Sequence, residues 1–356
     1  MTTTQAPVVD AQTPQAVEHL IRILNDGAIA VLASIGYQTG LFETLGTLPP
    51  ATSQQVADAA GLDERYVREW LGGIVAAEIV EYDPVARTYA LRPEHAPFVT
   101  GPSADNLARS LRYITLMGEV TPLVVEKFRT GGGLRYDQYP GFHDVQAQDS
   151  GAVNDGALLD TIVPLTGVVD RLREGIDVAD IGCGEGHAVN LLARAFPRSR
   201  FTGYDFSAEA LAPARAEAAA WGLSNATFVE CDIAEPPVPS TLDLVTAFDV
   251  VHDQAHPAQV LANVRSSLRP GGTFLMADIN ASSHLERNLD LPWASFLYAV
   301  STVHCMSVSL GQGGDGLGTV WGVELAEQML REAGFTQIER TVLDDDPFNA
   351  YFVVRA

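Results

Sequence analysis

The chain has 356 residues, of which 47% are hydrophobic and 19% are charged, and its formal net charge at pH 7 is −23. This length and composition indicate a globular protein of two domains and exclude a disordered chain. A surface this acidic repels polyanions and anionic membranes, so we expect neither nucleic acid nor a membrane as a partner. Three widely spaced cysteines, no signal-peptide features in residues 1–15 and no recognisable membrane-spanning run predict a cytoplasmic protein.

The N-terminal residues divide into a polar, disordered tail over 1–15 and a helix that begins at Ala16. Apolar residues recur along this helix at helical spacing, namely Val17, Leu20, Ile21, Leu24, Ala28 and Leu32. A short tail is too small to cover such a stripe, and stripes of this kind mark partner interfaces. We therefore expect a homodimer that forms mainly through the N-terminal domain.

Residues 16–100 have the pattern of a winged helix-turn-helix domain. Helices are expected at Thr52–Ala59 and Glu64–Ala77, followed by short strands at Ile79–Tyr82 and Thr88–Leu91. Between residues 51 and 100 there are four basic and eight acidic residues, which gives a local net charge of −4. Because DNA affinity depends on basic groups that neutralise phosphates, we expect this domain to serve in dimerisation or as a cap over a substrate pocket.

Residues 101–175 are expected to form a helical connection that contributes to the pocket, and residues 176–356 to form an α/β domain. In the second region, short buried strands alternate with helices, which is typical of a parallel sheet. Near the C-terminus, a helix at Val323–Ala333 precedes the strands Gln337–Val342 and Ala350–Val354. These two strands suit an antiparallel hairpin at the edge of the sheet.

A glycine-rich turn lies between a predicted strand and a predicted helix at Val178–His187. Gly182, Gly184 and Gly186 allow a tight turn and a close approach of the backbone to a ligand, and Asp180 precedes them. Nicotinamide dehydrogenases have a similar turn, but their G-x-G-x-x-G spacing requires a glycine where this chain has His187. A nicotinamide enzyme is therefore an alternative rather than the leading interpretation.

Acidic residues follow the next two strands in order. Asp205 follows the strand Phe201–Tyr204, where its two oxygens suit both hydroxyls of a ribose. Asp232 and Ile233 follow the strand Thr227–Glu230, where they suit an adenine amino group and the face of the ring. The pattern continues with the strand Leu242–Phe248 and with a turn at Leu268–Gly272 that leads into the strand Thr273–Ala277.

This ordered set, from about Asp177 to Ala356, resembles the class I S-adenosylmethionine (SAM)-dependent methyltransferases. The resemblance implies a Rossmann-like, mostly parallel seven-stranded sheet with an antiparallel C-terminal hairpin, and SAM as cofactor. The residues that it implies for the cofactor are Asp180, Gly182, Gly184, Gly186, Asp205, Phe206, Asp232, Ile233 and Phe248. With a winged-helix domain in front, the whole chain is similar to small-molecule O-methyltransferases, among them the plant phenolic enzymes, and to a bacterial winged-helix group.

The segment Phe248–Asp253 resembles the W-x-x-H-D segment of these enzymes, in which the histidine is the catalytic base. The resemblance implies that role for His252, with Asp278 or the adjacent Asp253 as the carboxylate that stabilises its charged form. A free imidazole titrates near 6.5 and a phenol near 10, so direct proton transfer is uphill by roughly 5 kcal/mol. A metal-assisted mechanism that uses Asp249, Asp253 and Asp278 is an alternative; we expect no metal.

A water-excluding pocket is expected around the acceptor. The segment Phe142–Ser150 resembles the family's F-N-x-x-M-x-x-x-S segment, with His143 and Gln146 in place of Asn and Met. The candidate pocket residues are Tyr136, Tyr139, Phe142, His143, Trp293, Phe296 and Trp321. The leading hypothesis is methylation of a hydroxyl on a small molecule. Methylation of nitrogen, sulfur or carbon is an alternative, as is a SAM-binding regulator whose winged helix reads DNA.

Overall fold

The computed structural model describes residues 13–235 and 241–356. It forms two compact units, Met1–Thr115 and Leu116–Ala356. Each unit is described below by itself. The division falls inside helix α7 (Arg112–Thr130), and therefore inside the segment 101–175 that was expected to form a single connection.

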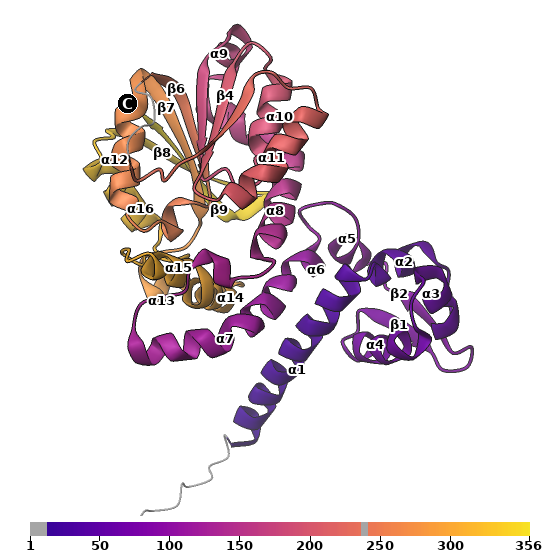
Figure 1. Cartoon of the computed structure of the whole chain (residues 1–356). Coiled ribbons are helices and arrows are strands. Elements are labelled where there is room, and N and C mark those ends of the chain that lie inside the picture. Colours follow the sequence, from indigo (N-terminus) through magenta and orange to yellow (C-terminus); the bar gives the residue numbers. More distant parts are fainter. Residues whose placement is uncertain (1–12, 236–240) are drawn as a thin grey trace, which may run out of the picture. The chain divides into compact units, whose positions relative to one another are not determined.

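The N-terminal unit consists of helices and one two-stranded hairpin (Figure 1). Its elements are α1 (Thr13–Gln38), α2 (Leu41–Thr47), α3 (Ser53–Ala60), α4 (Glu64–Ala76), β1 (Val80–Asp83), β2 (Thr88–Leu91), α5 (Ala96–Val99) and α6 (Leu107–Ser110). Strands β1 and β2 pair antiparallel, with Val80 opposite Leu91. The order of α3, α4 and the hairpin confirms the predicted winged helix-turn-helix.

Local side-chain signals fix the ends of the two motif helices. The Thr52 hydroxyl accepts a hydrogen bond from the Gln55 amide, and the Gln55 side chain accepts one from the Thr52 amide, which is a capping box. Gly61 ends α3 with a φ of 68°, a conformation that favours glycine. Asp63 then begins α4 by accepting from the Tyr66 amide.

Helix α1 starts at Thr13, three residues earlier than expected from the sequence, and it is anchored at its C-terminal half. The indole of Trp70 in α4 donates a hydrogen bond of 2.8 Å to the carbonyl of Leu32, and Trp70 packs edge-on against Phe42. The other half of the apolar stripe is exposed on this chain. Leu20 and Leu24 are 64% and 72% exposed.

The C-terminal unit has helices on both faces of a seven-stranded sheet, with α10 and α11 on one face and α12 and α16 on the other (Figure 1). Before the sheet come η1 (Tyr136–Gln138), α8 (Phe142–Val153), the π-helix η2 (Asn154–Ile162), η3 (Val163–Thr166) and α9 (Val169–Glu174). The sheet region contains β3 (Asp177–Ile181), α10 (His187–Ala195), β4 (Arg200–Asp205), α11 (Ala208–Ala220), β5 (Ala226–Glu230), β6 (Leu242–Phe248), η4 (Val251–Asp253), α12 (Pro257–Ser267) and β7 (Leu268–Ile279). It is followed by α13 (Leu285–Asn288), α14 (Ala294–Val300), the π-helix η5 (Ser301–Cys305), α15 (Met306–Gly311), α16 (Val323–Glu332), β8 (Gln337–Leu343) and β9 (Asp346–Arg355).

The strand order is β5-β4-β3-β6-β7-β9-β8. Strands β3 to β7 are parallel, whereas β9 runs antiparallel to both β7 and β8. This confirms the predicted sheet with its antiparallel C-terminal hairpin. One expectation was wrong: Leu268–Gly272 is not a turn before β7 but part of it, because Leu268 already pairs with Leu242 before a register shift. Strand β7 also continues to Ile279, so Asp278 lies within it and not after its end.

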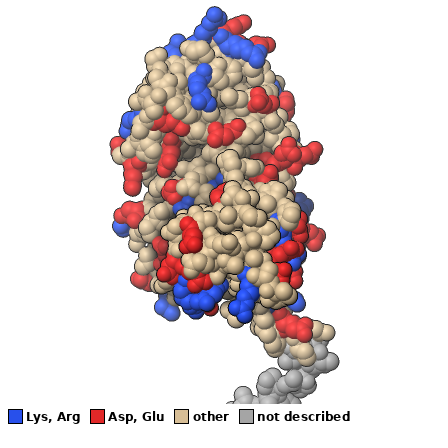
Figure 2. Space-filling view, turned by 90° about the vertical axis from the view of Figure 1, so that its right-hand side faces the viewer, with Lys and Arg blue, Asp and Glu red and all other residues tan. Residues whose placement is uncertain are grey.

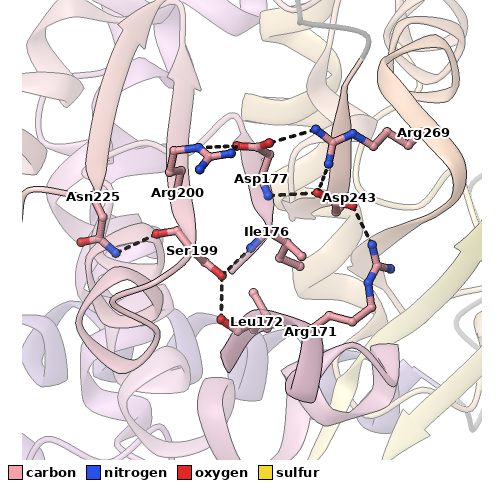
Figure 3. Close-up of polar contacts among 9 residues, drawn as sticks. All are labelled: Arg171, Leu172, Ile176, Asp177, Ser199, Arg200, Asn225, Asp243 and Arg269. Carbon is pink, nitrogen blue, oxygen red and sulfur yellow. Dashed lines mark hydrogen bonds and ion pairs between the residues drawn. The ribbon is translucent and has the colours of Figure 1, made fainter. Parts of the chain in front are cut away.

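An ionic network closes the amino-terminal edge of the parallel sheet (Figure 3). Asp243, at the start of β6, accepts from Arg171 at 2.6 Å, from Arg269 and from the backbone amide of Asp177 at 3.1 Å. The Asp177 carboxylate in turn pairs with Arg200 and Arg269. These contacts join α9 to β3, β4, β6 and β7 at the edge opposite the carboxyl ends of the strands.

Within residues 13–235 and 241–356, two helical stretches, Pro14–Gln38 and Ala294–Gly311, are long and apolar enough to cross a membrane by length and composition alone. Sequence inspection had found no such run. The second stretch comprises α14, η5 and α15, and its residues Ser301, Cys305 and Ser309 are buried within the C-terminal unit. The first stretch is α1, whose exposed apolar face has already been described.

Candidate active site

The glycine-rich turn connects β3 to α10 and has open space at one of its three glycines. Gly182, Gly184 and Gly186 have φ values of 62°, 51° and 69°, which disfavour any other residue. A Cβ on Gly182 would lie 2.4 Å from Val250, and one on Gly186 would lie 2.4 Å from Phe228. These two glycines are therefore required by packing. A Cβ on Gly184 would meet nothing within 4 Å, so a ligand can approach the backbone there.

Two carboxylates flank this turn. Asp180 is buried in β3, and its Oδ1 accepts a hydrogen bond of 2.5 Å from the Thr246 hydroxyl. Asp205, at the end of β4, accepts from the amides of Gly184 at 2.9 Å and Ser207 at 2.8 Å. Burial raises the pKa of Asp180 to about 7 and also raises the pKa of Asp205. A cation or additional hydrogen-bond donors near either group would stabilise its ionised form.

The other residues predicted to hold the cofactor follow or end the neighbouring parallel strands, whose carboxyl ends share one edge of the sheet. Phe248 ends β6, and Ile233 is buried after β5. Asp232 is exposed, and its side chain accepts from the Ala234 amide at 2.8 Å. Phe206 is 41% exposed and follows Asp205 directly. The predicted positions therefore lie at or just beyond one edge of the sheet, and their role in cofactor binding stays a prediction.

A buried histidine–carboxylate pair joins the segment after β6 to strand β7. His252, in η4 after β6, is 4% exposed, and its Nδ1 lies 2.8 Å from Oδ1 of Asp278 in β7. The same oxygen accepts from the Trp321 indole at 3.0 Å and from the Ile279 amide at 2.8 Å. Asp278 is thereby oriented toward the imidazole. The nearby Cys305 thiol also contributes to raising the pKa of His252.

Charge around the pair favours a protonated imidazole. Burial alone would lower the pKa of His252, but the Asp278 carboxylate and its hydrogen bond outweigh burial and hold this pKa well above the usual value. Asp253, the other candidate partner, instead accepts from the Gln254 side chain at 3.1 Å, and burial raises its pKa to about 6. Burial and the charge of Asp278 raise the pKa of Asp249 to about 7. Within the described residues, no three His, Cys, Asp or Glu side chains are arranged to hold a metal ion.

Aromatic rings from η1, α8 and η5 form a cluster in the same unit. Tyr136 stacks on His143 with ring centroids 4.8 Å apart and meets Phe206 edge-on at 5.4 Å. Phe142 stacks on His304 at 3.4 Å, and Tyr139 meets His304 edge-on at 4.7 Å. Four of the predicted pocket residues are thus brought together beside Phe206 at the cofactor edge.

The remaining predicted pocket residues are placed differently. The Trp321 ring is 4% exposed and supports Asp278 through its indole nitrogen. Trp293 packs on Phe348, with ring centroids 5.7 Å apart, next to β7. Phe296 lies in α14, half-buried.

Sequence inspection did not single out His304. It lies in an apolar helical stretch, Ala294–Gly311, where no motif or spacing marks it. Only the folded chain shows that its buried ring joins Tyr136, Tyr139 and Phe142. The only sequence signal for a functional role of His304 is that it is a single histidine within an apolar stretch.

Comparison with known families assigns both parts of the chain. Residues 27–101 match the Rv2258c-like winged helix-turn-helix domain, and residues 172–334 match a methyltransferase domain. Trans-aconitate 2-methyltransferase of Rhodopseudomonas palustris is 33% identical over 122 residues, which are 33% of this chain and 46% of that protein. Demethylspheroidene O-methyltransferase of Rhodobacter capsulatus is 23% identical over 80% of this chain and 69% of that protein. The chain spans about half the length of several of the trans-aconitate relatives that it matches.

Solved structures share the fold over nearly the whole chain. Human N-acetylserotonin methyltransferase superimposes with a TM-score of 0.69 at 16% identity, over 100% of this chain and 99% of that one. Mitomycin 7-O-methyltransferase gives a TM-score of 0.68 at 19% identity, over 97% and 99% of the two chains. The predictions of the fold, of a methyltransferase and of SAM as its cofactor are confirmed at the level of the domain. The chain therefore contains an Rv2258c-like winged-helix domain and a methyltransferase domain, and it has the fold of the class I SAM-dependent methyltransferases.

Proposed function

We propose that the protein transfers the methyl group of SAM to a hydroxyl of a small, uncharged acceptor, with His252 as general base. The observation that carries the proposal is the buried contact of 2.8 Å between His252 Nδ1 and Asp278 Oδ1. SAM supplies an activated methyl group, so the enzyme has to orient the acceptor, exclude water and remove one proton. Asp180, Gly184 and Asp205 would hold the cofactor at the carboxyl edge of the sheet.

Asp278 brings the pKa of His252 closer to that of a phenol. A raised imidazole pKa narrows the gap to a phenol near 10, and each unit of that gap is worth about 1.4 kcal/mol. The imidazolium that forms on proton transfer stays paired with the carboxylate, so its charge is compensated in the buried site. A deprotonated thiol or an acid needs no such base, which favours a hydroxyl over those acceptors.

The surroundings of the site favour an uncharged acceptor over a carboxylate such as trans-aconitate. Apart from burial, the groups that the pKa shifts of His252, His143 and His304 are traced to are carboxylates, other histidines and Cys305. Arginine and lysine are the side chains that pair most strongly with a carboxylate. Demethylspheroidene O-methyltransferase is similar in sequence, and the N-acetylserotonin and mitomycin methyltransferases are similar in fold. The substrates in their names agree better with this site.

We further propose a cytoplasmic homodimer that forms through α1 and binds no nucleic acid. The exposed stripe of α1 is apolar, and Cys183, Cys231 and Cys305 are all free thiols, as in a reducing compartment. On the face in Figure 2, acidic and basic side chains alternate with large uncharged areas, without one continuous basic patch. Such a face does not suit a phosphate backbone.

The test is transfer of a radiolabelled methyl group from SAM to a panel of phenols, alcohols, amines, thiols and carboxylic acids. We expect phenols or alcohols to be methylated, and His252→Ala to lower turnover by about 10²–10⁴-fold while SAH still binds. Asp253→Asn, at the carboxylate that does not contact the imidazole, serves as the matched control. Methylation of amines, thiols or carboxylates alone, or full activity of His252→Ala, would contradict the proposal.

A further inference from the structure

We propose that His304 is a specificity-determining residue that hydrogen-bonds a second polar group of an aromatic acceptor, next to the hydroxyl that is methylated. The inference rests on the proposed function and adds the substrate class: a flat, uncharged phenol with an adjacent hydrogen-bonding substituent. The imidazole ring of His304 has an unusual feature. His304 is 2% exposed, and neither Nδ1 nor Nε2 has a hydrogen-bond partner among the described residues.

A buried imidazole without partners is costly, and native proteins rarely keep one without a reason. Each ring nitrogen gives up its hydrogen bonds to water on folding, and nothing in the described chain replaces them. A phenylalanine would fill the same space between Phe142, Tyr136 and Tyr139 without this cost. The nitrogens therefore point to a partner that is not part of the chain.

The position of His304 is set by a local irregularity of its helix. Residues Ser301–Cys305 form a π-helix between α14 and α15, and single π-turns of this kind often occur at functional sites. His252 helps to lower the pKa of His304, and the next residue, Cys305, helps to raise the pKa of His252, so His304 lies near the proposed base. A group on the acceptor that reaches His304 thus lies beside the reacting hydroxyl, which is the reason for an adjacent substituent.

The ring is held neutral, which defines what it can recognise. Burial, followed by the nearby charge of His252 and of His143, keeps the pKa of His304 well below its usual value. A neutral imidazole has one donor and one acceptor, whereas an imidazolium has two donors. It therefore suits an amide, hydroxyl or carbonyl substituent rather than a carboxylate. The parallel rings of Phe142 and His304 and of Tyr136 and His143 suit a flat ring as neighbour.

The experiment compares two probes, phenol and 2-hydroxybenzamide, which differ by one adjacent amide. Each is titrated calorimetrically into the SAH-saturated full-length protein. We expect the wild type to bind 2-hydroxybenzamide at least about tenfold more tightly than phenol, the worth of one hydrogen bond to a buried group. His304→Phe should remove this preference. His304→Gln, which keeps one donor and one acceptor, should retain part of it.

Melting temperatures separate recognition from a structural role. Because its nitrogens have no partner, His304→Phe should leave the Tm of the ligand-free protein unchanged or raise it. The matched control is His187→Phe, which loses hydrogen bonds to Glu217 and Asp155 and should lower the Tm. A fall in the Tm of His304→Phe like that of the control would assign His304 to the fold and overturn the inference.

The outcomes also distinguish this inference from the proposed function. If phenols are methylated in a His252-dependent way, but His304→Phe keeps the preference or the wild type has none, only the inference on His304 fails. If the wild type binds neither probe, it has no preference between them, and this result also overturns only the inference on His304. If SAH does not bind, or no hydroxyl is methylated, the proposed function fails first.

Discussion

The backbone amide of Gly184 donates a hydrogen bond of 2.9 Å to Oδ2 of Asp205, which ties the end of β4 to the glycine-rich turn after β3. The other carboxylate oxygen accepts from the Ser207 amide, so the start of α11 depends on the same side chain. One residue thus shapes the turn and supplies the negative charge that faces the cofactor edge. Loss of Asp205 should affect ligand binding through both effects.

Asp205→Ala should weaken SAH binding by about 10–100-fold, because hydrogen bonds to a charged group contribute about 1.5–3 kcal/mol. Asp205→Asn keeps one acceptor oxygen and should fall between the wild type and the alanine variant. Isothermal titration measures both affinities, and the Tm of the ligand-free proteins shows how much of each loss comes from the turn. Wild-type affinity in Asp205→Ala would refute the assignment of this carboxylate to the cofactor.

Asp180 should release a proton when SAH binds. Its pKa of about 7 in the free protein means that about half of the molecules carry the proton at pH 7. The ammonium group of the ligand would favour the ionised form, so about half a proton should leave per molecule bound at that pH. Titrations in buffers of different ionisation enthalpy measure this number. The release should vanish in Asp180→Asn; an equal release in that variant would assign it to another group.

The pH profile of kcat/KM should report the pairing of His252 with Asp278. Because the pKa of His252 is raised, the rate should increase with pH through a limb that lies above the usual imidazole range. In Asp278→Asn, burial lowers the pKa of His252 and no carboxylate raises it. The rising limb should therefore move to lower pH, and the maximal rate should fall. A limb at the same pH in both proteins would show that Asp278 does not set the basicity of the imidazole.

The same pair should contribute to stability at low pH. A histidine whose folded-state pKa is raised stabilises the fold fully below its unfolded-state pKa, near 6.5, and this contribution is lost as the pH rises through the folded-state value. The difference in Tm between the wild type and His252→Gln should therefore shrink as the pH increases from 6 toward that value. A difference that grows over this range would contradict the sign of the shift.

Glutamate substitutions on α1 should produce monomers if the stripe is a dimer interface. Leu20→Glu and Leu24→Glu together place two charges on its exposed apolar face. We expect light scattering to show a dimer for the wild type and a monomer for the double variant. Val85→Glu, at a 93% exposed position in the turn between β1 and β2, is the matched control and should remain a dimer. A wild-type monomer that sediments with lipid vesicles would instead assign the stripe to a membrane.

Asp243→Asn should destabilise the C-terminal unit without a direct effect on ligands, because Asp243 lies at the opposite edge of the sheet (Figure 3). Its side chain is 8% exposed and contacts two arginines and a backbone amide. We expect the Tm to fall by about 3–8 °C. The control is Asp170→Asn, because the Asp170 side chain is 90% exposed and its ion pair with Arg173 should contribute almost nothing. Equal Tm values for both variants would show that the network is dispensable.

The chain order of strands, glycines and acidic residues was sufficient to predict the class I fold, whereas the cofactor-binding role of the residues at the carboxyl edge of the sheet stays a prediction. Local rules predict where Asp180, Gly182 and Asp205 lie. A buried strand must end, the turn after it needs positive φ, and a carboxylate after the next parallel strand lies at the same edge of the sheet. The winged helix was predictable for the same reason, since Thr52 and Asp63 cap their helices through contacts three residues away.

Only the tertiary structure decided between the partners of His252 and revealed His304. Asp253 is adjacent to His252 in sequence, yet the hydrogen bond goes to Asp278, 26 positions away, because β6 and β7 lie side by side in the sheet. The contacts of His304 with Tyr136 and Phe142 join segments more than 150 residues apart. Local propensity determines where helices and strands begin and end. Which side chains share a buried site depends on how those elements pack, and a single sequence has no local signal for that.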